Sequence, residues 1–181
     1  MFSSRPNHAA GQRGQEYAKS CDFATIFHDQ VDGLFTLSLL LTADEHKAEQ
    51  CFVKGLDDCM KGSPVFREWA QSWARRIIIK NAIRILSPRP SEDRVAVRQN
   101  GGEPPAPASD ATVVGDIRRL ACFERFVYVV SVLEGYSARD CSSLLCCTVR
   151  QVVEARTRAC RQLAQRSLRR SRALAHENVG G

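Results

Sequence analysis

Apolar residues recur every three or four positions along two stretches of the chain, and neither stretch shows the strict alternation of a strand. In the first stretch, residues 21–86, we predict three helices. The apolar face of the first helix, which should end near Leu41, consists of Phe27, Val31, Leu34, Phe35 and Leu39. The inward face of the second consists of Ala48, Cys51, Phe52, Leu56 and Cys59. The third should bury Phe66, Trp69, Trp73 and Ile77.

Polar residues that cap helices predict where these elements begin. Thr42 and Glu45 have the spacing of a capping box, in which each side chain accepts a hydrogen bond from the backbone N–H of the other residue. Ser63 followed by Pro64 is typical of an N-cap and a first helical position. We therefore expect the third helix to run from Pro64 to about Leu86.

The second stretch, residues 116–173, predicts a helix from Asp116 to Leu133 that Gly135 should end. Two capping boxes follow it. Ser137 and Asp140 should cap a short helix, and Thr148 and Gln151 should cap a long one that continues beyond Leu163. Two capped helices separated by about three residues have the outline of a helix-turn-helix.

Proline and glycine separate the two stretches. Five of the seven prolines lie in residues 87–115, together with Gly101 and Gly102, and this composition opposes regular structure. We predict an all-α fold of two small helical domains joined by this linker. The expected organisation is a polar tail at 1–20, a first domain at 21–86, the linker at 87–115, a second domain at 116–173 and a tail at 174–181.

The net charge of +6 is concentrated in the second domain. Residues 117–173 contain twelve arginines, four acidic residues and no lysine. Such a block favours a polyanionic partner, because each phosphate contact releases condensed counterions. A basic surface that is only solvated is the alternative, and charge alone does not separate the two.

The remaining composition excludes several classes of protein. The chain has no apolar run long enough to cross a membrane and its N-terminal residues are polar, so we expect a cytoplasmic, nucleoid-associated protein. We interpret Cys51, Cys59, Cys141 and Cys160 as small core residues on apolar faces. The four histidines lie far apart and there is no glycine-rich phosphate loop. We therefore expect no cofactor, no metal site and no enzymatic activity.

The long C-terminal helix carries the candidate DNA-reading residues. One side should pack inward through Val149, Val152, Val153, Cys160 and Leu163. The opposite side presents Arg150, Gln151, Glu154, Thr157, Arg158 and Arg161. The first turn of a recognition helix reaches base edges, so Arg150, Gln151 and Glu154 are the candidates for base reading. The candidates for phosphate contacts are Arg158, Arg161, Arg166, Arg169, Arg170 and Arg172.

A second basic stripe lies on the third helix of the first domain. Arg76, Lys80 and Arg84 are four residues apart and would lie beside Trp69 and Trp73. The tryptophans at this spacing are more typical of a core than of a binding surface. We therefore expect the three cations, and not the two rings, to face DNA.

These motifs resemble a known family. The C-terminal motifs are similar to region 4 of bacterial RNA polymerase sigma factors of the extracytoplasmic-function type, and the N-terminal motifs are similar to region 2 of the same family. The region 4 resemblance rests on Tyr136-Ser137-Ala138-Arg139-Asp140-Cys141, Val149-Arg150-Gln151-Val152 and Arg158-Ala159-Cys160-Arg161-Gln162-Leu163. The region 2 resemblance rests on Leu34-Phe35, Leu39-Leu40-Leu41-Thr42, Ala48-Glu49, Trp73, Arg76-Ile77 and Ala82-Ile83.

The resemblance implies a transcription initiation protein. Its helix-turn-helix would bind the −35 element of promoter DNA, and its second helix would bind core RNA polymerase through Glu49, Val53 and Leu56. The family also makes an anti-sigma factor a candidate partner. Cys146 stands in the turn where the family usually has a small residue, often glycine.

Two alternatives stay open. Gln50 and Lys54 stand where the family usually has acidic residues, which favours a DNA-binding regulator, derived from a sigma factor, that does not direct initiation. A helical protein-interaction adaptor is the second alternative, and in it the arginines would only solvate the surface. Salt-sensitive retention on DNA would separate the adaptor from the other two.

Overall fold

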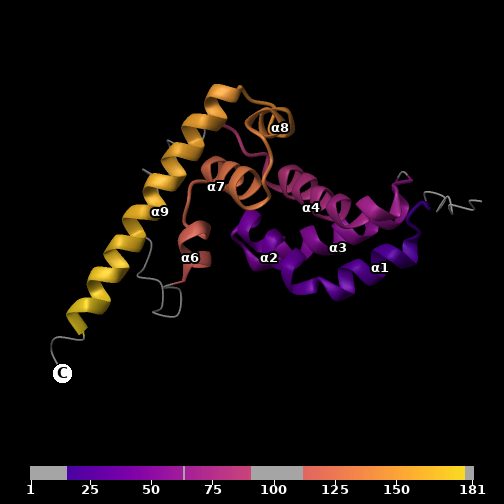
Figure 1. The fold of residues 1–181 in the computed structure, drawn as a ribbon, viewed down its shortest axis with the longest axis horizontal. Coiled ribbons are helices and arrows are strands. Elements are labelled where there is room, and N and C mark those ends of the chain that lie inside the picture. Colours follow the sequence, from indigo (N-terminus) through magenta and orange to yellow (C-terminus); the bar gives the residue numbers. More distant parts are fainter. Residues whose placement is uncertain (1–15, 63, 91–111, 178–181) are drawn as a thin grey trace, which may run out of the picture.

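The computed structural model describes residues 16–62, 64–90 and 112–177, and the regular structure in these ranges is helical. Extended segments in the same ranges pair only at an isolated antiparallel bridge between Tyr17 and Phe66. The prediction of an all-α protein is therefore confirmed. Figure 1 shows an N-terminal and a C-terminal group of helices that lie against each other. None of the described helices combines the length and the apolar content needed to cross a bilayer.

The N-terminal group has four α-helices around a shared apolar core. They are α1 (Ser20–Asp29), α2 (Val31–Thr42), α3 (Glu45–Lys61) and α4 (Ala70–Leu86). The single first helix that we predicted is wrong, because the chain leaves helical geometry at Gln30, with φ −117 and ψ 25. This break lets Phe27 of α1 and Leu34 of α2 both enter the core. Neither glycine nor proline marks it, so the sequence pattern did not indicate it.

The predicted capping box at Thr42 is also wrong. Thr42 is the last residue of α2, and its buried hydroxyl donates to the carbonyl oxygen of Ser38 at 2.9 Å. The N-cap of α3 is instead Asp44, whose carboxylate accepts from the backbone N–H of Lys47 at 2.8 Å. Within α3 the predicted inward face is confirmed. Ala48, Cys51 and Cys59 are buried, and the half-buried Phe52 and Leu56 pack against the core.

The third helix begins later than predicted. Pro64 precedes an extended segment, a 3₁₀ turn η1 spans Arg67–Trp69, and α4 starts only at Ala70; Ser63 lies outside the described residues. The reason is tertiary, because the backbone N–H of Ala18 donates to the carbonyl oxygen of Val65 at 2.8 Å. This pairing with the segment before α1 occupies backbone that a helix would need.

The inward face of α4 differs from the prediction. Its buried residues are Ala70, Ala74, Ile78, Ile79, Asn81 and Ala82. Trp69 is exposed, and Trp73 and Ile77 are half-buried. Small residues allow α4 to pack closely on α3, where a Cβ added to Gly55 would lie 2.5 Å from Cδ1 of Ile78. Large side chains carry the stronger hydrophobic signal in the sequence, and Gly55 carries no signal of this close contact.

The C-terminal group packs three short helices against one long helix. Its elements are α6 (Val113–Arg118), α7 (Cys122–Tyr128), the π-helical segment η3 (Val129–Leu133), α8 (Ala138–Leu144) and α9 (Val149–Glu177). The predicted helix from Asp116 to Leu133 is wrong in its continuity, because the chain turns between α6 and α7. Thr112 caps α6 by accepting from the backbone N–H of Gly115 at 3.1 Å. Gly135, with φ 72, ends η3 as predicted.

Buried polar contacts join the two groups. Arg125 of α7 is buried, and its guanidinium donates to the carbonyl oxygens of Leu41 at 3.2 Å and Thr42 at 3.4 Å, at the end of α2. Arg75 of α4 donates to both carboxylate oxygens of Glu134 at 2.7 and 2.5 Å. The end of α2 therefore has its last carbonyls satisfied by the other group. Most of the predicted linker, at 91–111, lies outside the described residues.

Candidate functional site

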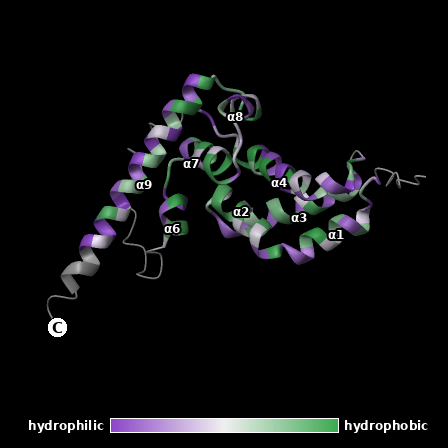
Figure 2. Ribbon diagram, in the orientation of Figure 1, coloured by the Kyte–Doolittle hydropathy of each residue, from purple (hydrophilic) through white to green (hydrophobic). Residues whose placement is uncertain are grey.

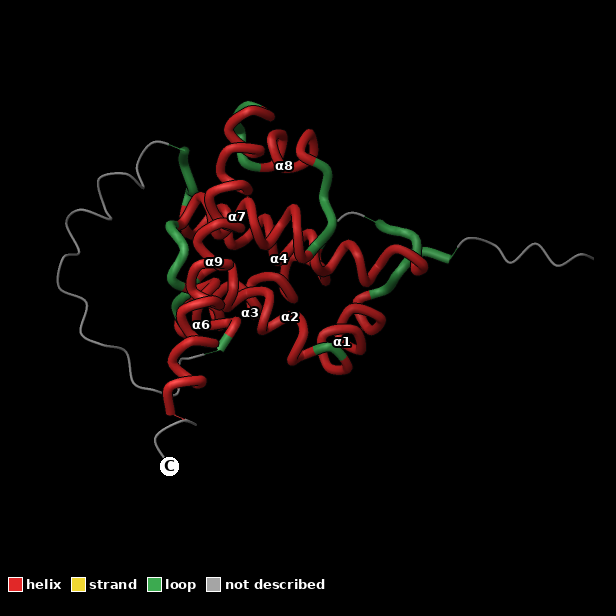
Figure 3. Tube along the Cα trace, turned by 60° about the vertical axis from the view of Figure 1, so that its left-hand side comes forward, coloured by secondary structure: helices red, strands yellow, loops and turns green. Residues whose placement is uncertain are grey.

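Local hydrogen bonds set the start of α8 and of α9. The Ser137 hydroxyl accepts from the backbone N–H of Asp140 at 3.1 Å. At α9 the Thr148 hydroxyl accepts from the N–H of Gln151 at 3.2 Å, and the Gln151 side chain accepts from the N–H of Thr148 at 2.8 Å. Both predicted N-caps are confirmed. The complete capping box forms at Thr148, whereas the Asp140 carboxylate accepts from the hydroxyl of Ser137 at 2.6 Å. The caps produce two helices joined by a short loop, as Figure 3 shows, which is the backbone outline of a helix-turn-helix.

The loop between α8 and α9 contains a left-handed residue. Cys146 has φ 49, and the N–H of the following Cys147 donates to the carbonyl oxygen of Ser142 at 3.0 Å. This hydrogen-bond pattern ends a helix with a residue in the left-handed region, a position that favours glycine. Cys146 therefore carries backbone strain at the turn that orients α9.

The inward face of α9 is narrower than predicted. Val152, Ala155 and Ala159 are fully buried against α7 and its neighbours, whereas Val149 and Val153 are exposed. Cys160 is exposed as well, so its assignment to the core is wrong. Ala155 and Ala159 are small, which allows α7 and α9 to pack closely. Val149 and Val153 lie outside this contact.

The outer face of α9 carries most of the predicted base-reading residues. Arg150 is exposed and its Nε donates to Oε1 of Glu154 at 2.8 Å, one helical turn away. This hydrogen bond raises the pKa of Arg150. Thr157 and Arg161 are exposed on the same side. Gln151 is half-buried, and because its carbonyl oxygen serves the helix cap, it is the least available of the predicted set.

Three of the predicted phosphate-contacting arginines instead face the protein. Nε of Arg158 lies 2.5 Å from Oε1 of Glu124, a carboxylate that Gln162 also contacts at 2.9 Å. Arg166 donates to the carbonyl oxygen of Asp116 at 2.7 Å, and Arg170 forms an ion pair with the carboxylate of Asp116.

Glu124 and Asp116 are buried acids, so these cations neutralise them. The outward-facing arginines of this half of α9 are Arg161, Arg169 and Arg172.

The basic stripe of α4 is engaged differently. Nζ of Lys80 lies 5.7 Å from the centre of the Trp73 ring, a cation–π arrangement. Arg84 donates to Oδ2 of Asp58 at 3.0 Å, so its charge is largely offset. Arg76 is half-buried beside them. The structure brings the three predicted residues onto one helix face, where Asp58 offsets the charge of Arg84 alone.

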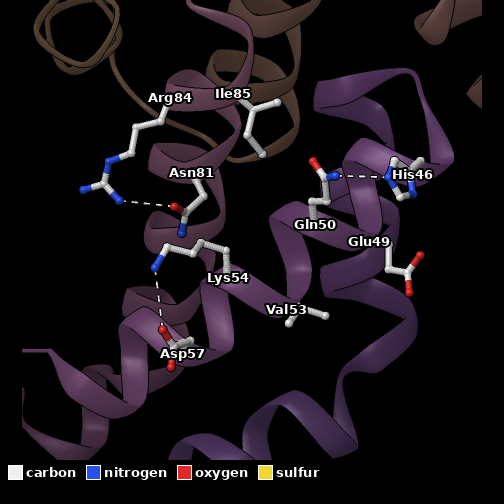
Figure 4. A pocket seen from close by; sticks show the side chains of 9 residues that line it. All are labelled: His46, Glu49, Gln50, Val53, Lys54, Asp57, Asn81, Arg84 and Ile85. Carbon is white, nitrogen blue, oxygen red and sulfur yellow. Dashed lines mark hydrogen bonds and ion pairs between the residues drawn. The ribbon is translucent and has the colours of Figure 1, made fainter.

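The exposed side of α3 borders an open depression between α3 and α4. Its volume is about 810 Å³. Figure 4 shows Glu49 and Val53 on the α3 side and Asn81, Arg84 and Ile85 on the α4 side. The predicted polymerase-binding residues Glu49 and Val53 therefore lie together at its rim, whereas Leu56 turns toward the core.

Most of the charged side chains at this depression form ion pairs with one another. Nζ of Lys54 lies 3.1 Å from Asp58 and 3.6 Å from Asp57, and Asp57 also pairs with Lys61. Among the described residues that line the depression, Glu49 is the acid without an ion pair.

No cluster of metal-ligating side chains occurs among the described residues. Burial raises the pKa of the Cys51, Cys59 and Cys141 thiols, to about 11, 12 and 11, so these groups stay protonated and inert near neutrality. Comparison of the chain with models of known protein families and with curated proteins finds no match.

Proposed function

We propose that this protein is a sigma-factor-like transcription initiation protein with a region 2-like and a region 4-like domain. In this proposal α9 binds the −35 element of promoter DNA, and the exposed side of α3 binds core RNA polymerase. The resemblance of the sequence motifs to the extracytoplasmic-function sigma factors motivates it. The observation that carries it is the capped α8–loop–α9 unit, whose outer helix face presents Arg150 and Arg161 to solvent.

The arrangement of α9 supports DNA binding in two ways. Its first turn is exposed and holds Arg150 and Glu154, side chains that can recognise guanine and cytosine edges in the major groove. Arg161, Arg169 and Arg172 continue the basic surface along the helix at positions suited to phosphates. Recognition helices enter the major groove with their N-terminal residues leading, which matches this order.

The depression between α3 and α4 supports polymerase binding. Val53 is an exposed apolar residue at its rim, next to Glu49, which has no ion pair among the described residues. An exposed apolar residue with a charged residue at its edge fits the apolar centre and polar rim of a protein interface. The proposal therefore assigns the two partners to different helix groups.

The decisive experiment measures both activities on the purified full chain. We expect co-elution with core RNA polymerase at low salt, and salt-sensitive binding to promoter duplexes that weakens about fivefold in Arg161→Ala. Arg89→Ala removes an exposed arginine outside α9 and serves as the matched control. Equal losses in both variants, or no DNA binding by a folded protein, would contradict the proposal and favour the adaptor.

A DNA-binding regulator that does not direct initiation is the second candidate. The observation that favours it is Lys54, which lies inside the depression and pairs with Asp57 and Asp58. These pairs reduce the acidic character of the α3 surface. DNA binding that depends on Arg161, combined with no retention of core polymerase, would select this candidate.

A further inference from the structure

Three cysteines lie at or beside the turn between α8 and α9, and they differ in exposure. Cys146 is exposed, Cys147 is half-buried and Cys141 is fully buried. Cys146 also borders an open depression of about 640 Å³ between the end of α4 and α8, so small molecules in solution reach it. Of the three thiols, Cys146 is therefore the one that a dissolved oxidant meets first.

Cys147 is the nearest partner for an oxidised Cys146. The two are neighbours in the chain, and their Cα atoms lie about 3.8 Å apart across a trans peptide bond. Cys141 lies more than one helical turn earlier in the chain, and its side chain is enclosed by the apolar core. Burial raises the pKa of the Cys147 thiol as well, which slows its attack on Cys146. An oxidised Cys146 should therefore persist long enough to be trapped.

A bond between these neighbours would be strained and easily reduced. Disulfides usually join residues whose Cα atoms are about 4.4–6.8 Å apart. The shorter spacing of adjacent residues stores strain, and strained disulfides have the higher reduction potentials that small thiols reverse readily. A Cys146–Cys147 bond would thus be a labile one and not a structural one.

The bond also requires the turn to change. In the reduced protein the sulfur of Cys146 lies 4.0 Å from the carbonyl oxygen of Ser143, whereas Cys147 packs against the apolar core. Cys146 has φ 49, and the backbone N–H of Cys147 donates to the carbonyl oxygen of Ser142 at 3.0 Å. Because the two side chains have different surroundings, joining their sulfurs requires the backbone of the turn to rotate, which breaks this hydrogen bond.

We propose that Cys146 and Cys147 form a redox-active pair that a hydroperoxide converts to a disulfide. The Cys146 thiolate attacks a peroxide oxygen and the O–O bond breaks, which leaves a sulfenic acid on Cys146. The thiol proton ends on the alcohol or water that departs. The Cys147 sulfur then attacks the Cys146 sulfur, the S–O bond breaks, and the hydroxyl group departs as water with the Cys147 proton.

Two electrons pass in this sequence from the two thiols to the peroxide. A small dithiol or two small monothiols return the pair to the reduced form by thiol–disulfide exchange, and they become a disulfide themselves. The pair is therefore a reversible modification site that needs no bound cofactor.

The turn sets how α9 lies on the protein. Figure 2 shows apolar and polar residues in turn along this helix, and its buried face packs on α7 through Val152 and Ala155. Loss of the hydrogen bond between Cys147 and Ser142 releases the start of α9 from the end of α8. In the proposed function this part of α9 reads base edges, so oxidation weakens DNA binding. That consequence rests on the proposed function, whereas the disulfide does not.

The test treats the reduced full chain with an equimolar amount of hydrogen peroxide and then alkylates the remaining thiols in urea. Trypsin cleaves after arginine and releases residues 140–150, which contain all three cysteines. We expect this peptide to lose two hydrogen atoms and to carry the alkyl group on Cys141. A bond between Cys146 and Cys147 lets fragmentation by mass spectrometry separate Cys141 from the pair, whereas a bond to Cys141 encloses the residues between.

Matched variants assign the two roles. Cys147→Ser should stop at the sulfenic acid, which dimedone traps on Cys146, and should form at least about tenfold less disulfide. Cys146→Ser should give neither product in this peptide. Cys160→Ser removes the exposed cysteine of α9 and is the control, which should form the disulfide like the parent chain. Circular dichroism checks that each variant keeps its helices.

Hydrogen exchange follows the turn itself. The backbone amide of Cys147 should exchange at least about tenfold faster in the oxidised chain, because it has lost its bond to Ser142. Reduction with dithiothreitol should restore the protection. The oxidised chain should also bind promoter duplex about tenfold more weakly, which is the contribution of one base contact.

Three results would overturn the redox pair. They are an unchanged mass of the peptide, a bond that includes Cys141, and a parent-like yield of disulfide in Cys147→Ser. Unchanged exchange of the Cys147 amide after oxidation would overturn the change in the turn. If the reduced chain binds DNA and the oxidised chain binds it equally, the link to DNA is wrong. If the reduced chain does not bind DNA at all, the proposed function fails and the disulfide, measured without DNA, is unaffected.

Discussion

Basic side chains are arranged differently on the surface of the N-terminal helices and on α9. On the N-terminal group, Lys54 and Arg84 pair with Asp58, and Lys80 lies over Trp73. On α9 the arginines divide between two directions. Arg158, Arg166 and Arg170 face buried acids or backbone, whereas Arg161, Arg169 and Arg172 point to solvent.

This difference shows that a count of arginines overestimates the charge offered to a polyanion. An arginine that neutralises a buried acid contributes to folding, and one with a partner at the surface has part of its charge offset. On α9 the exposed arginines Arg161, Arg169 and Arg172 lie apart from the inward contacts of Arg158, Arg166 and Arg170. Substitutions of inward-facing and outward-facing arginines test that division.

Arg125→Met should lower the free energy of unfolding by about 3 kcal/mol, because it leaves carbonyl oxygens at the end of α2 without their buried donor. Urea denaturation followed by circular dichroism measures the change. Arg139→Met, at an exposed arginine of α8, is the control and should change stability little. Equal stability of the two variants would show that the contact between the helix groups does not hold the fold.

Arg150→Ala should weaken binding to the preferred duplex by between about fivefold and a hundredfold and should relax specificity at one position. The reason is its exposed place in the first turn of α9. Arg84→Ala should have a much smaller effect on every duplex, because Arg84 lies on α4, outside the α8–loop–α9 unit. Binding isotherms on matched and scrambled duplexes provide the comparison. If Arg84→Ala causes the greater loss, the basic stripe of α4 and not α9 is the principal DNA contact.

Arg158→Ala should lower the free energy of unfolding by about 1–2 kcal/mol, because Glu124 loses a cationic partner. DNA binding by Arg158→Ala should depend on salt concentration as steeply as binding by the parent chain does. Arg161→Ala should show the reverse pattern, with unchanged stability and a salt dependence reduced by about one counterion. If the two variants change stability and salt dependence alike, the division between inward-facing and outward-facing arginines is contradicted.

Cys146→Gly should raise the free energy of unfolding by about 0.5–1 kcal/mol, because glycine adopts the left-handed conformation at this turn without strain. Thermal or urea denaturation detects a change of this size. Cys146→Ala is the control. It removes the thiol but keeps a Cβ in the left-handed conformation, so it should give no gain in stability. A gain of the same size in both would assign the effect to loss of the thiol.

Alkylation of cysteines near neutral pH should modify the exposed thiols before the buried ones, without any substitution in the protein. Cys21, Cys146 and Cys160 are exposed and should react first. Cys51 and Cys59 should react only on unfolding, because burial raises their pKa to about 11 and about 12. Mass spectrometry over a time course measures the order. Early reaction of Cys51 would indicate that the N-terminal group opens readily.

Features that depend on residues close together in the chain could be predicted from the sequence. The caps at Ser137 and Thr148 formed as predicted because the donor and the acceptor lie three residues apart, within reach of any helix that starts there. The glycine that ends η3 and the all-helical character follow from local conformational preference in the same way.

Which helix faces are buried, and which arginines face solvent, depends on contacts between distant parts of the chain. Ala155 and Ala159 set the buried side of α9 because α7 approaches them closely, although larger side chains nearby carry the stronger hydrophobic signal. The start of α4 depends on pairing with Ala18, which is distant in sequence. Arg158 and Arg161 look alike in the sequence, and Glu124, 34 residues before Arg158, gives them different roles. Such contacts join positions whose separation in the sequence carries no local signal, so the folded arrangement alone selects them.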